Sequence, residues 1–431
     1  MTAESGRPLR GLDRVGFWLL WSSIFALFGI ALANGLLALA VLAAVAFVVA
    51  GGGVEPARWP RQATPLAWAL LAYASCLVLS GAMSLRPAVS MGSVASDLFT
   101  LTTLPLVLFW VRSPRDVERL AGAILALGTL ASVFGIGQAL ALGLGDLERR
   151  PPSLFSHYMT HSGVLVIALC LALARWSTRD AGSRGLLRGG SGRVAAAALV
   201  GLFSVALLLT LTRGAWIAAA AVGFVVLVLR ARRLLPFLAV ALVLSGLLLS
   251  QCAPEYWQRA RSITSVDDES NYDRLCMLWA GAEIVRDRPV LGLGPDLVAD
   301  YYPIYRHPTA PRPVVKHLHN TYVQLAAEAG LATLCAYLLF IGAGCWLAFR
   351  LLRRARSASA SESEATTGAS GDRADWIVFA CLLTLGTFSF AGLFEANWRD
   401  TEIQRLVLVV LALPVAIARL RENGRDVGSQ G

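Results

Sequence analysis

The sequence has 431 residues, of which 56% are hydrophobic and only 15% are charged. Repeated apolar runs of about 18 residues or more exclude an ordinary soluble domain and predict an all-α, polytopic integral membrane protein. The formal net charge is +10, but the arginines lie in short loops between apolar runs. This distribution argues against a nucleic-acid partner and indicates a topology signal.

The apolar runs predict about twelve transmembrane helices. They lie at 16–33, 36–51, 63–82, 93–111, 118–142, 157–175, 194–212, 215–230, 235–252, 322–349, 375–394 and 402–418. The first two are short and are separated by Asn34 and Gly35, so a re-entrant hairpin is an alternative there. We therefore divide the chain into nine helices in 1–252, a large loop at 253–321 with short helices, and three helices in 322–431.

The loops predict the orientation. If the N-terminus is cytoplasmic, every inside loop is basic, as the positive-inside rule requires. Both termini then lie in the cytoplasm, and the 253–321 loop lies outside. Residues 357–372 are rich in Ser, Ala, Glu, Thr and Gly, a composition typical of a polar linker. This linker and the tail after the last span are expected in the cytoplasm.

The cysteines and acidic residues give little evidence of a cofactor. Cys252 and Cys276 lie in or beside the 253–321 loop and could pair in an oxidising compartment, but nothing in the sequence fixes their geometry. No Cys/His spacing indicates zinc. The adjacent acids at 267–269 are more typical of a solvated loop than of a metal site. We expect neither a metal nor another cofactor.

Polar residues of the spans gather at one depth. Those within about two helical turns of the outer end are Asp97, Gln138, His157, His161, Arg213, Glu328 and Glu395. Charges inside a membrane are costly, so their depth is informative. A transporter is expected to place polar groups near the midplane. The outer position favours an enzyme that acts where a lipid headgroup meets water.

The first catalytic candidate lies in the segment 316–322, Lys-His-Leu-His-Asn-Thr-Tyr, at the start of an apolar run. Histidine titrates near neutral pH and suits proton transfer from a sugar hydroxyl. His319, followed directly by Asn320, is the candidate base. The alternative interpretation is a histidine that caps a helix or lies in the headgroup layer.

Two arginines are candidates for binding a diphosphate. Arg213 lies in a tight outer turn, where positive charge is disfavoured, and Arg274 begins an amphipathic stretch that is predicted to lie on the outer leaflet. Guanidinium groups bind phosphate oxygens bidentately. The alternative is an arginine that reaches lipid headgroups. The glycines at 289–295 follow no strand and precede no Gly-Lys-Ser/Thr, so they predict a tightly packed turn instead of a phosphate loop.

Four motifs in this order resemble the O-antigen ligase and O-antigen polymerase superfamily of bacterial inner-membrane proteins. They are Thr-Arg-Gly-Ala-Trp at 212–216, Asp-Arg-Leu-x-Met-x-Trp at 273–279, Pro-x-x-Gly-x-Gly-Pro at 289–295 and His-x-His-Asn at 317–320. The resemblance covers about 200–336. The ligase pattern continues nine residues after Asn320 with Gly-x-x-Gly, and here the second glycine is Thr333, a departure that affects helix packing.

The resemblance implies inverting, metal-independent glycosyl transfer from undecaprenyl pyrophosphate to a hydroxyl of lipid A-core. His319 would be the base, Arg213 and Arg274 would bind the donor pyrophosphate, and the supporting residues would be His317, Asn320, His161 and Tyr322. The active site would face the periplasm, at the surface of the inner membrane. A polymerase that uses another lipid-linked glycan as acceptor is the close alternative. A protein O-oligosaccharyltransferase and a lipid-glycan transporter are more distant ones.

Overall fold

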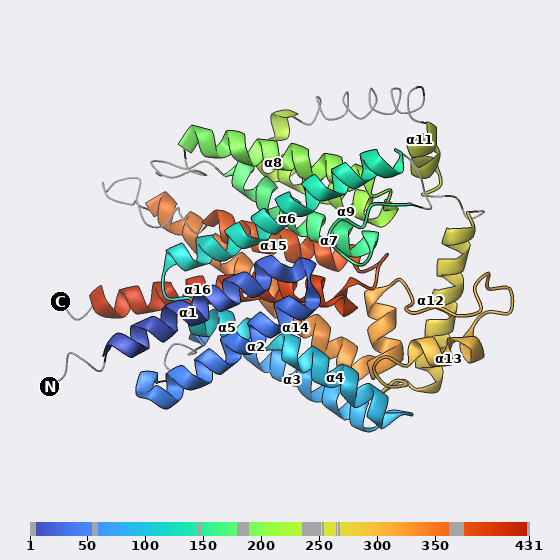
Figure 1. Ribbon diagram of the computed structural model, residues 1–431, viewed down its shortest axis with the longest axis horizontal. Helices are drawn as coiled ribbons and strands as arrows, with labels where there is room; N and C mark the ends of the chain where they lie inside the picture. The colour runs from blue at the N-terminus through green and yellow to red at the C-terminus, as the bar shows by residue number, and fades with distance from the viewer. Residues whose placement is uncertain are drawn as a thin grey trace.

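The computed structural model describes residues 6–53, 59–144, 149–178, 189–234, 251, 254–263, 265, 268–361 and 375–428. This part of the chain is a bundle of α-helices without strands (Figure 1). Ten segments within it are long and apolar enough to cross a membrane. The prediction of an all-α polytopic membrane protein is confirmed.

The membrane-spanning segments follow the predicted apolar runs closely. Their helices are α1 (Gly6–Phe25), α2 (Ile30–Phe47), α3 (Thr64–Ala82), α4 (Pro87–Leu101) with α5 (Thr103–Trp110), α6 (Pro114–Leu142), α7 (Tyr158–Ser177), α8 (Gly189–Leu209), α9 (Arg213–Arg230), α14 (Thr321–Ser361) and α16 (Thr401–Gly428). The shorter apolar helix α15 (Asp375–Ala391) matches one further predicted span. The predicted span at 235–252 lies almost wholly outside the described residues. The first two runs correspond to two helices, α1 and α2, which pack on each other. Their predicted separation at Asn34 and Gly35 is wrong, because both residues lie inside α2 and the break lies at residues 26–29.

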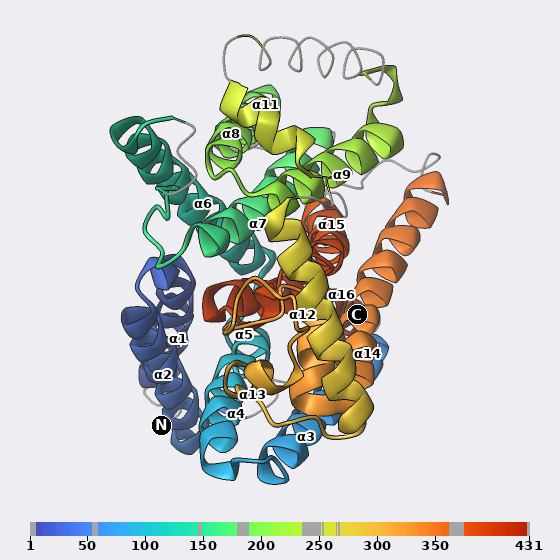
Figure 2. The same cartoon turned by 90° about the vertical axis from the view of Figure 1, so that its right-hand side faces the viewer.

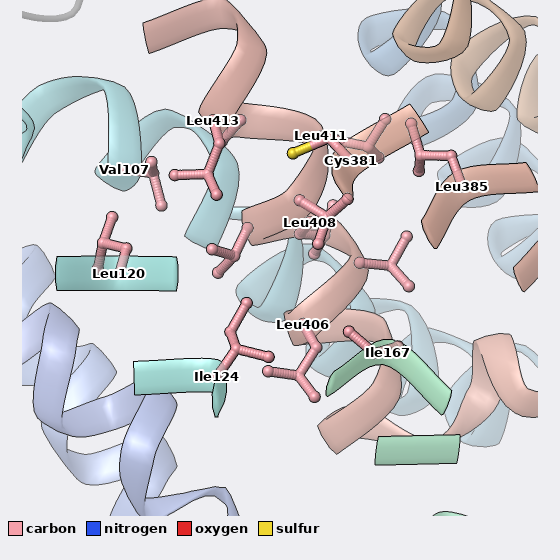
Figure 3. Close-up of a cluster of buried hydrophobic side chains, with 14 of the residues drawn as sticks. Val107, Leu120, Ile124, Ile167, Cys381, Leu385, Leu406, Leu408, Leu411 and Leu413 are labelled. Atoms are coloured by element: carbon pink, nitrogen blue, oxygen red, sulfur yellow. The ribbon is translucent and has the colours of Figure 1, made fainter. Parts of the chain in front are cut away.

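The core of the bundle is built around α16 and α7. Of the most apolar 18 residues of each helix, 94% are buried in α16 and 89% in α7, against 28% in α2. A helix that is apolar all round is expected at the centre of a bundle. Leucines of α16 accordingly pack against Val107, Ile124, Ile167 and Leu385 from four other helices (Figure 3).

One end of the bundle is covered by α11 (Pro254–Arg261), α12 (Glu269–Asp287) and α13 (Val298–Tyr305). We call it the α12 end. Helix α12 crosses the bundle at this end (Figure 2), whereas α1 begins and α16 ends at the opposite end (Figure 1). The start of α1 and the end of α16 therefore lie on the same side of the bundle, and the predicted topology likewise places the two termini on one side.

Helix α12 is apolar on two faces. One face buries Met277, Ala280 and Ile284 in a second hydrophobic cluster with residues of α13 and α14. Another face carries Leu275 and Trp279, apolar residues of the amphipathic stretch that the sequence predicts on the outer leaflet, and both are about half exposed. The sequence pattern therefore located the helix correctly, but the face that packs on the bundle is one that it did not identify.

Helix α14 is kinked where the glycine turn at 289–294 inserts against it. Gly330 has φ +81°, and a Cβ on it would lie 1.9 Å from the carbonyl oxygen of Val290. The amides of Leu293 and Gly294 donate to the carbonyls of residues 327 and 328, which the kink frees. This backbone pairing confirms the predicted tight turn and explains why glycine is required there.

Two predicted features differ from the structure or lie outside it. The linker predicted at 357–372 begins too early, because α14 continues as a helix to Ser361, and residues 362–374 lie outside the described part. Cys276 is buried and free, while Cys252 lies outside the described residues.

Candidate active site

A cavity of about 560 Å³ opens at the α12 end of the bundle. Three segments that are far apart in the sequence line it: residues 150–159 before and at the start of α7, residues 269–274 at the start of α12, and residues 311–319 before α14. The cavity is therefore formed only when the chain folds. His319 and Arg274 both contribute to its wall.

His319 is held in an unusual backbone conformation. Its φ is +49°, in the left-handed region that few residues other than glycine adopt. The next residue, Asn320, accepts hydrogen bonds from the amides of Tyr322 and Val323, both at 3.0 Å, and so caps the start of α14. Its Nδ2 donates to the carbonyl of Leu393 at 3.0 Å. The cap and this bond fix the backbone from which the His319 side chain projects into the cavity.

Glu395 lies directly behind His319. It follows α15 in the chain, is 4% exposed, and places Oε2 3.1 Å from Nδ1 of His319. The hydroxyl of Thr321 donates to the Glu395 carbonyl at 2.8 Å, which ties this segment to the start of α14. Because a carboxylate only accepts, Nδ1 must carry the proton of this bond, and Nε2 of a neutral His319 then keeps its lone pair.

Arg274 binds the other oxygen of the same carboxylate. Its Nη2 donates to Oε1 of Glu395 at 2.8 Å, and its Nη1 donates to the carbonyl of Phe394 at 3.0 Å. Burial raises the pKa of Glu395, but the bond from His319 and the charge of Arg274 outweigh burial and lower it below its usual value. Glu395 is therefore ionised near neutral pH and holds a potential base and a fixed cation side by side.

Arg213 does not line the cavity. It is 8% exposed at the start of α9, where its Nη1 donates to the carbonyl of Ser262 at 2.9 Å and its Nη2 to Asp268 at 3.0 Å. Asp268 also accepts from the amide of Asn271 at 3.1 Å and so caps α12. Arg213 consequently anchors the start of the helix that carries Arg274.

A scan against protein-family models matches residues 196–338 to the O-antigen ligase family. This segment is similar to that family, and we call it the O-antigen ligase domain. The match supports the O-antigen ligase superfamily, and the domain includes Arg213, Arg274 and His319. A search of curated proteins gives no match to the chain. Two parts of the site lie outside the O-antigen ligase domain: Glu395, and the cavity wall at 150–159.

The four residues predicted as supporting have different positions around the domain. His317 lines the cavity with its ring 4.4 Å from that of His319. Asn320 acts on the backbone, as described above. His161 is fully buried and bonds through Nδ1 to the carbonyl of Pro151 at 3.1 Å, which holds the 150–159 wall. Tyr322 donates to the carbonyl of Ser389 at 2.5 Å and does not line the cavity.

Sequence reasoning missed Glu395 as a site residue, although its depth near the outer end of a span was a signal. It also missed the cations Arg150, Arg312 and Lys316 of the cavity wall. Lys316 had a signal as well, because it is the only lysine in the chain. Among the described residues, no group of three or more His, Cys, Asp or Glu side chains is arranged to hold a metal ion. The cavity offers the positive charge of its arginines and its lysine to an anionic substrate.

Proposed function

We propose that this protein is an O-antigen ligase-type glycosyltransferase. It moves a polysaccharide from undecaprenyl pyrophosphate to a sugar hydroxyl of lipid A-core, without a metal or other cofactor. The observation that carries the proposal is the hydrogen-bonded series His319–Glu395–Arg274 at the wall of a basic cavity. The O-antigen ligase domain over 196–338 supports the class of reaction.

The reaction requires one base and one stabilised leaving group. Nε2 of His319 accepts the proton of the acceptor hydroxyl, whose oxygen attacks the anomeric carbon of the donor sugar with inversion. The bond from that carbon to the diphosphate oxygen breaks, and undecaprenyl pyrophosphate leaves with the bonding electrons. Arg274 stabilises the charge that develops on the diphosphate in the transition state. Glu395 positions both side chains and stabilises His319 once it is protonated.

Arg213 has a positioning role in this proposal. The sequence motif assigned it to the donor pyrophosphate, but its bonds to Ser262 and Asp268 favour an indirect contribution through α12. The donor site is then built around Arg274, and Arg213 fixes the helix from which Arg274 projects.

The proposal includes an orientation in the membrane. The α12 end faces the periplasm and both termini lie in the cytoplasm of a bacterial inner membrane. The basic loops at the opposite end support this orientation. The outer leaflet then supplies membrane lipids as neighbours of Leu275 and Trp279, which are both exposed. The lipid-linked donor reaches the cavity from that leaflet.

The test is a transfer assay with purified protein, lipid-linked glycan and lipid A-core in the presence of EDTA. We expect wild type to join donor and acceptor and His319→Ala to abolish transfer while donor binding is retained. His307→Ala is the matched control, because His307 lies in the same outer region, against Trp279, and does not line the cavity. Chelator-resistant activity is required by the proposal, and transfer by His319→Ala at the wild-type rate contradicts it.

The same assay separates the alternatives. A product that is only a longer lipid-linked glycan identifies a polymerase, and transfer to a protein hydroxyl identifies a protein O-oligosaccharyltransferase. A transporter predicts movement of lipid-linked glycan across proteoliposomes that persists in His319→Ala. Each of these outcomes differs in mass or in location, so the transfer assay distinguishes all four functions once a protein acceptor and a proteoliposome measurement are added to it.

A further inference from the structure

The cavity wall has more positive than negative charge. Its cations are Arg150, Arg274, Arg312 and Lys316, and its acids are Glu269 and Asp273. Two of the cations are compensated, because Arg312 pairs with the buried Asp273 and Arg274 pairs with Glu395 behind the wall. Lys316 is exposed and has no ion-pair partner among the described residues. An anionic group can therefore bind Lys316 without displacing an ion-pair partner.

Arg150 and Lys316 form a positive region that differs in setting from Arg274. Arg150 stacks over the ring of Tyr158, 4.3 Å from its centroid. Both cations line the cavity with His157. Burial lowers the pKa of His157, the charge of Glu395 raises it, and the charges of Arg150, His319 and Lys316 lower it. Arg274 is instead held against Glu395 and the Phe394 carbonyl, beside His319. We call Arg150, His157 and Lys316 the second cationic region.

The reaction proposed above needs two ligands in one cavity. The donor diphosphate must lie at Arg274, because its leaving oxygen is bonded to the carbon that the His319-activated hydroxyl attacks. The acceptor must approach His319 from the open cavity, whose wall there is the segment that carries Lys316, His317 and His319. The second cationic region thus lies where acceptor sugars next to the attacking hydroxyl are placed.

We propose that Lys316 and Arg150 bind an anionic substituent of the acceptor glycan, a phosphate or carboxylate. This inference rests on the proposed transfer reaction and adds a specificity for charged acceptors to it. Lysine acts on such a group as a point charge with three donors, and arginine as a planar fork. A charge-assisted bond in a partly enclosed cavity corresponds to a preference of roughly tenfold for a charged over a neutral acceptor.

The test compares a phosphorylated oligosaccharide acceptor with the same oligosaccharide after phosphatase treatment, at saturating donor. We expect wild type to prefer the phosphorylated form about tenfold in kcat/KM, mainly through KM. Lys316→Ala is expected to lose this preference, and Lys316→Arg to retain most of it. Arg286→Ala is the matched control, because Arg286 is a highly exposed cation of α12 outside the cavity; it is expected to leave the preference unchanged.

Two outcomes with active enzyme overturn the proposal. If Lys316→Ala raises the donor KM and lowers transfer to both acceptors equally, Lys316 is a donor ligand. If the preference is absent in wild type or unchanged in Lys316→Ala, the second cationic region does not select the acceptor.

If wild type transfers to neither acceptor, that result counts against the proposed function alone. Protection of Lys316 from chemical modification then tests acceptor binding directly. Lys316 is the only lysine, so reductive methylation of a side-chain amine reports on this one position. The phosphorylated oligosaccharide should slow methylation of Lys316, and the dephosphorylated one should not; equal rates overturn the proposal. Nanodiscs of zwitterionic and anionic lipid are compared without glycan, and protection by anionic lipid alone identifies a headgroup as the ligand and also overturns it.

Discussion

Glu395→Gln is the most direct test of the site, because it changes one charge and little volume. In the wild-type protein the carboxylate joins Nδ1 of His319 at 3.1 Å and Nη2 of Arg274 at 2.8 Å. In the variant, the amide oxygen accepts from Arg274, so the amide NH₂ must face His319. An NH₂ group donates, and Nδ1 of His319 must then accept. This tautomer places the proton on Nε2, where it blocks general-base action.

The size of the effect follows from the role of the base. General-base catalysis contributes about 10²–10⁴-fold, so kcat is expected to fall by about this factor, or roughly 3–5 kcal/mol at 1.36 kcal/mol per tenfold. The donor KM is expected to change little, since Arg274 keeps a hydrogen-bond acceptor. The assay is single-turnover transfer with saturating donor and acceptor, which separates the chemical step from product release.

Two comparisons make this result specific. Glu328→Gln removes another buried carboxylate that pairs with an arginine, Arg399, away from the cavity, and it is expected to lower stability with much smaller loss of kcat. The double variant Glu395→Gln with His319→Ala should be no slower than His319→Ala alone, because the two residues act as one unit. A Glu395→Gln enzyme with more than about one third of wild-type kcat would refute the assigned tautomer.

Three further predictions concern the backbone, the α12 anchor and pH. Gly330→Ala is expected to lower the thermal midpoint in detergent strongly, because its Cβ would lie 1.9 Å from the Val290 carbonyl oxygen at a φ of +81°; a wild-type midpoint would contradict this packing. Arg213→Ala should increase proteolysis near its partners Ser262 and Asp268 and should reduce kcat. Arg213→Lys should restore part of the protease resistance and part of kcat, whereas a change confined to donor KM would indicate direct donor binding. Burial and the charge of His319 lower the pKa of His317 to about 4, so the unfolded chain takes up this proton first. The free energy of unfolding therefore keeps the whole contribution of His317 above about pH 6.5 and loses it as the pH falls toward 4, by about 3 kcal/mol at most. His317→Gln should flatten this part of the pH–stability profile.

The sequence was sufficient for the membrane architecture because membrane insertion depends on local composition. About 18–20 apolar residues in succession must form a helix, since lipid offers no partner for backbone groups. Every predicted run in the described part lies largely in helix, although the break between α1 and α2 lies at residues 26–29 and not at the predicted Asn34 and Gly35. The glycine turn at 289–294 was also predictable from its glycines. The backbone of residues 327–328 excludes a side chain at Gly292, and the side chains of Ser84 and Ser90 exclude one at Gly294.

The candidate base and one candidate donor-binding residue were likewise recognisable in the sequence as residues of one site, and for a chemical reason. His319 and Arg274 are residue types whose proton affinity and charge suit the reaction, and they occur in recognisable local motifs. Both line one cavity although 45 positions separate them in the sequence. Arg213 belongs to an equally clear motif, yet its side chain is directed to Asp268 and away from the cavity. A motif defines which residues occur together in the chain, and it does not define the direction of each side chain.

The tertiary structure alone decided which groups act together. Glu395 is 76 positions from His319 and lies on a different segment of the bundle, so no local pattern could pair them. The same is true of Arg150 and Lys316, which line one cavity only because the wall before α7 packs beside the segment before α14. Helix periodicity and hydropathy are short-range properties and determined the spans. The tautomer of His319 and the charge of the cavity depend on residues far apart in the sequence. They are therefore defined only by the tertiary packing of the helices.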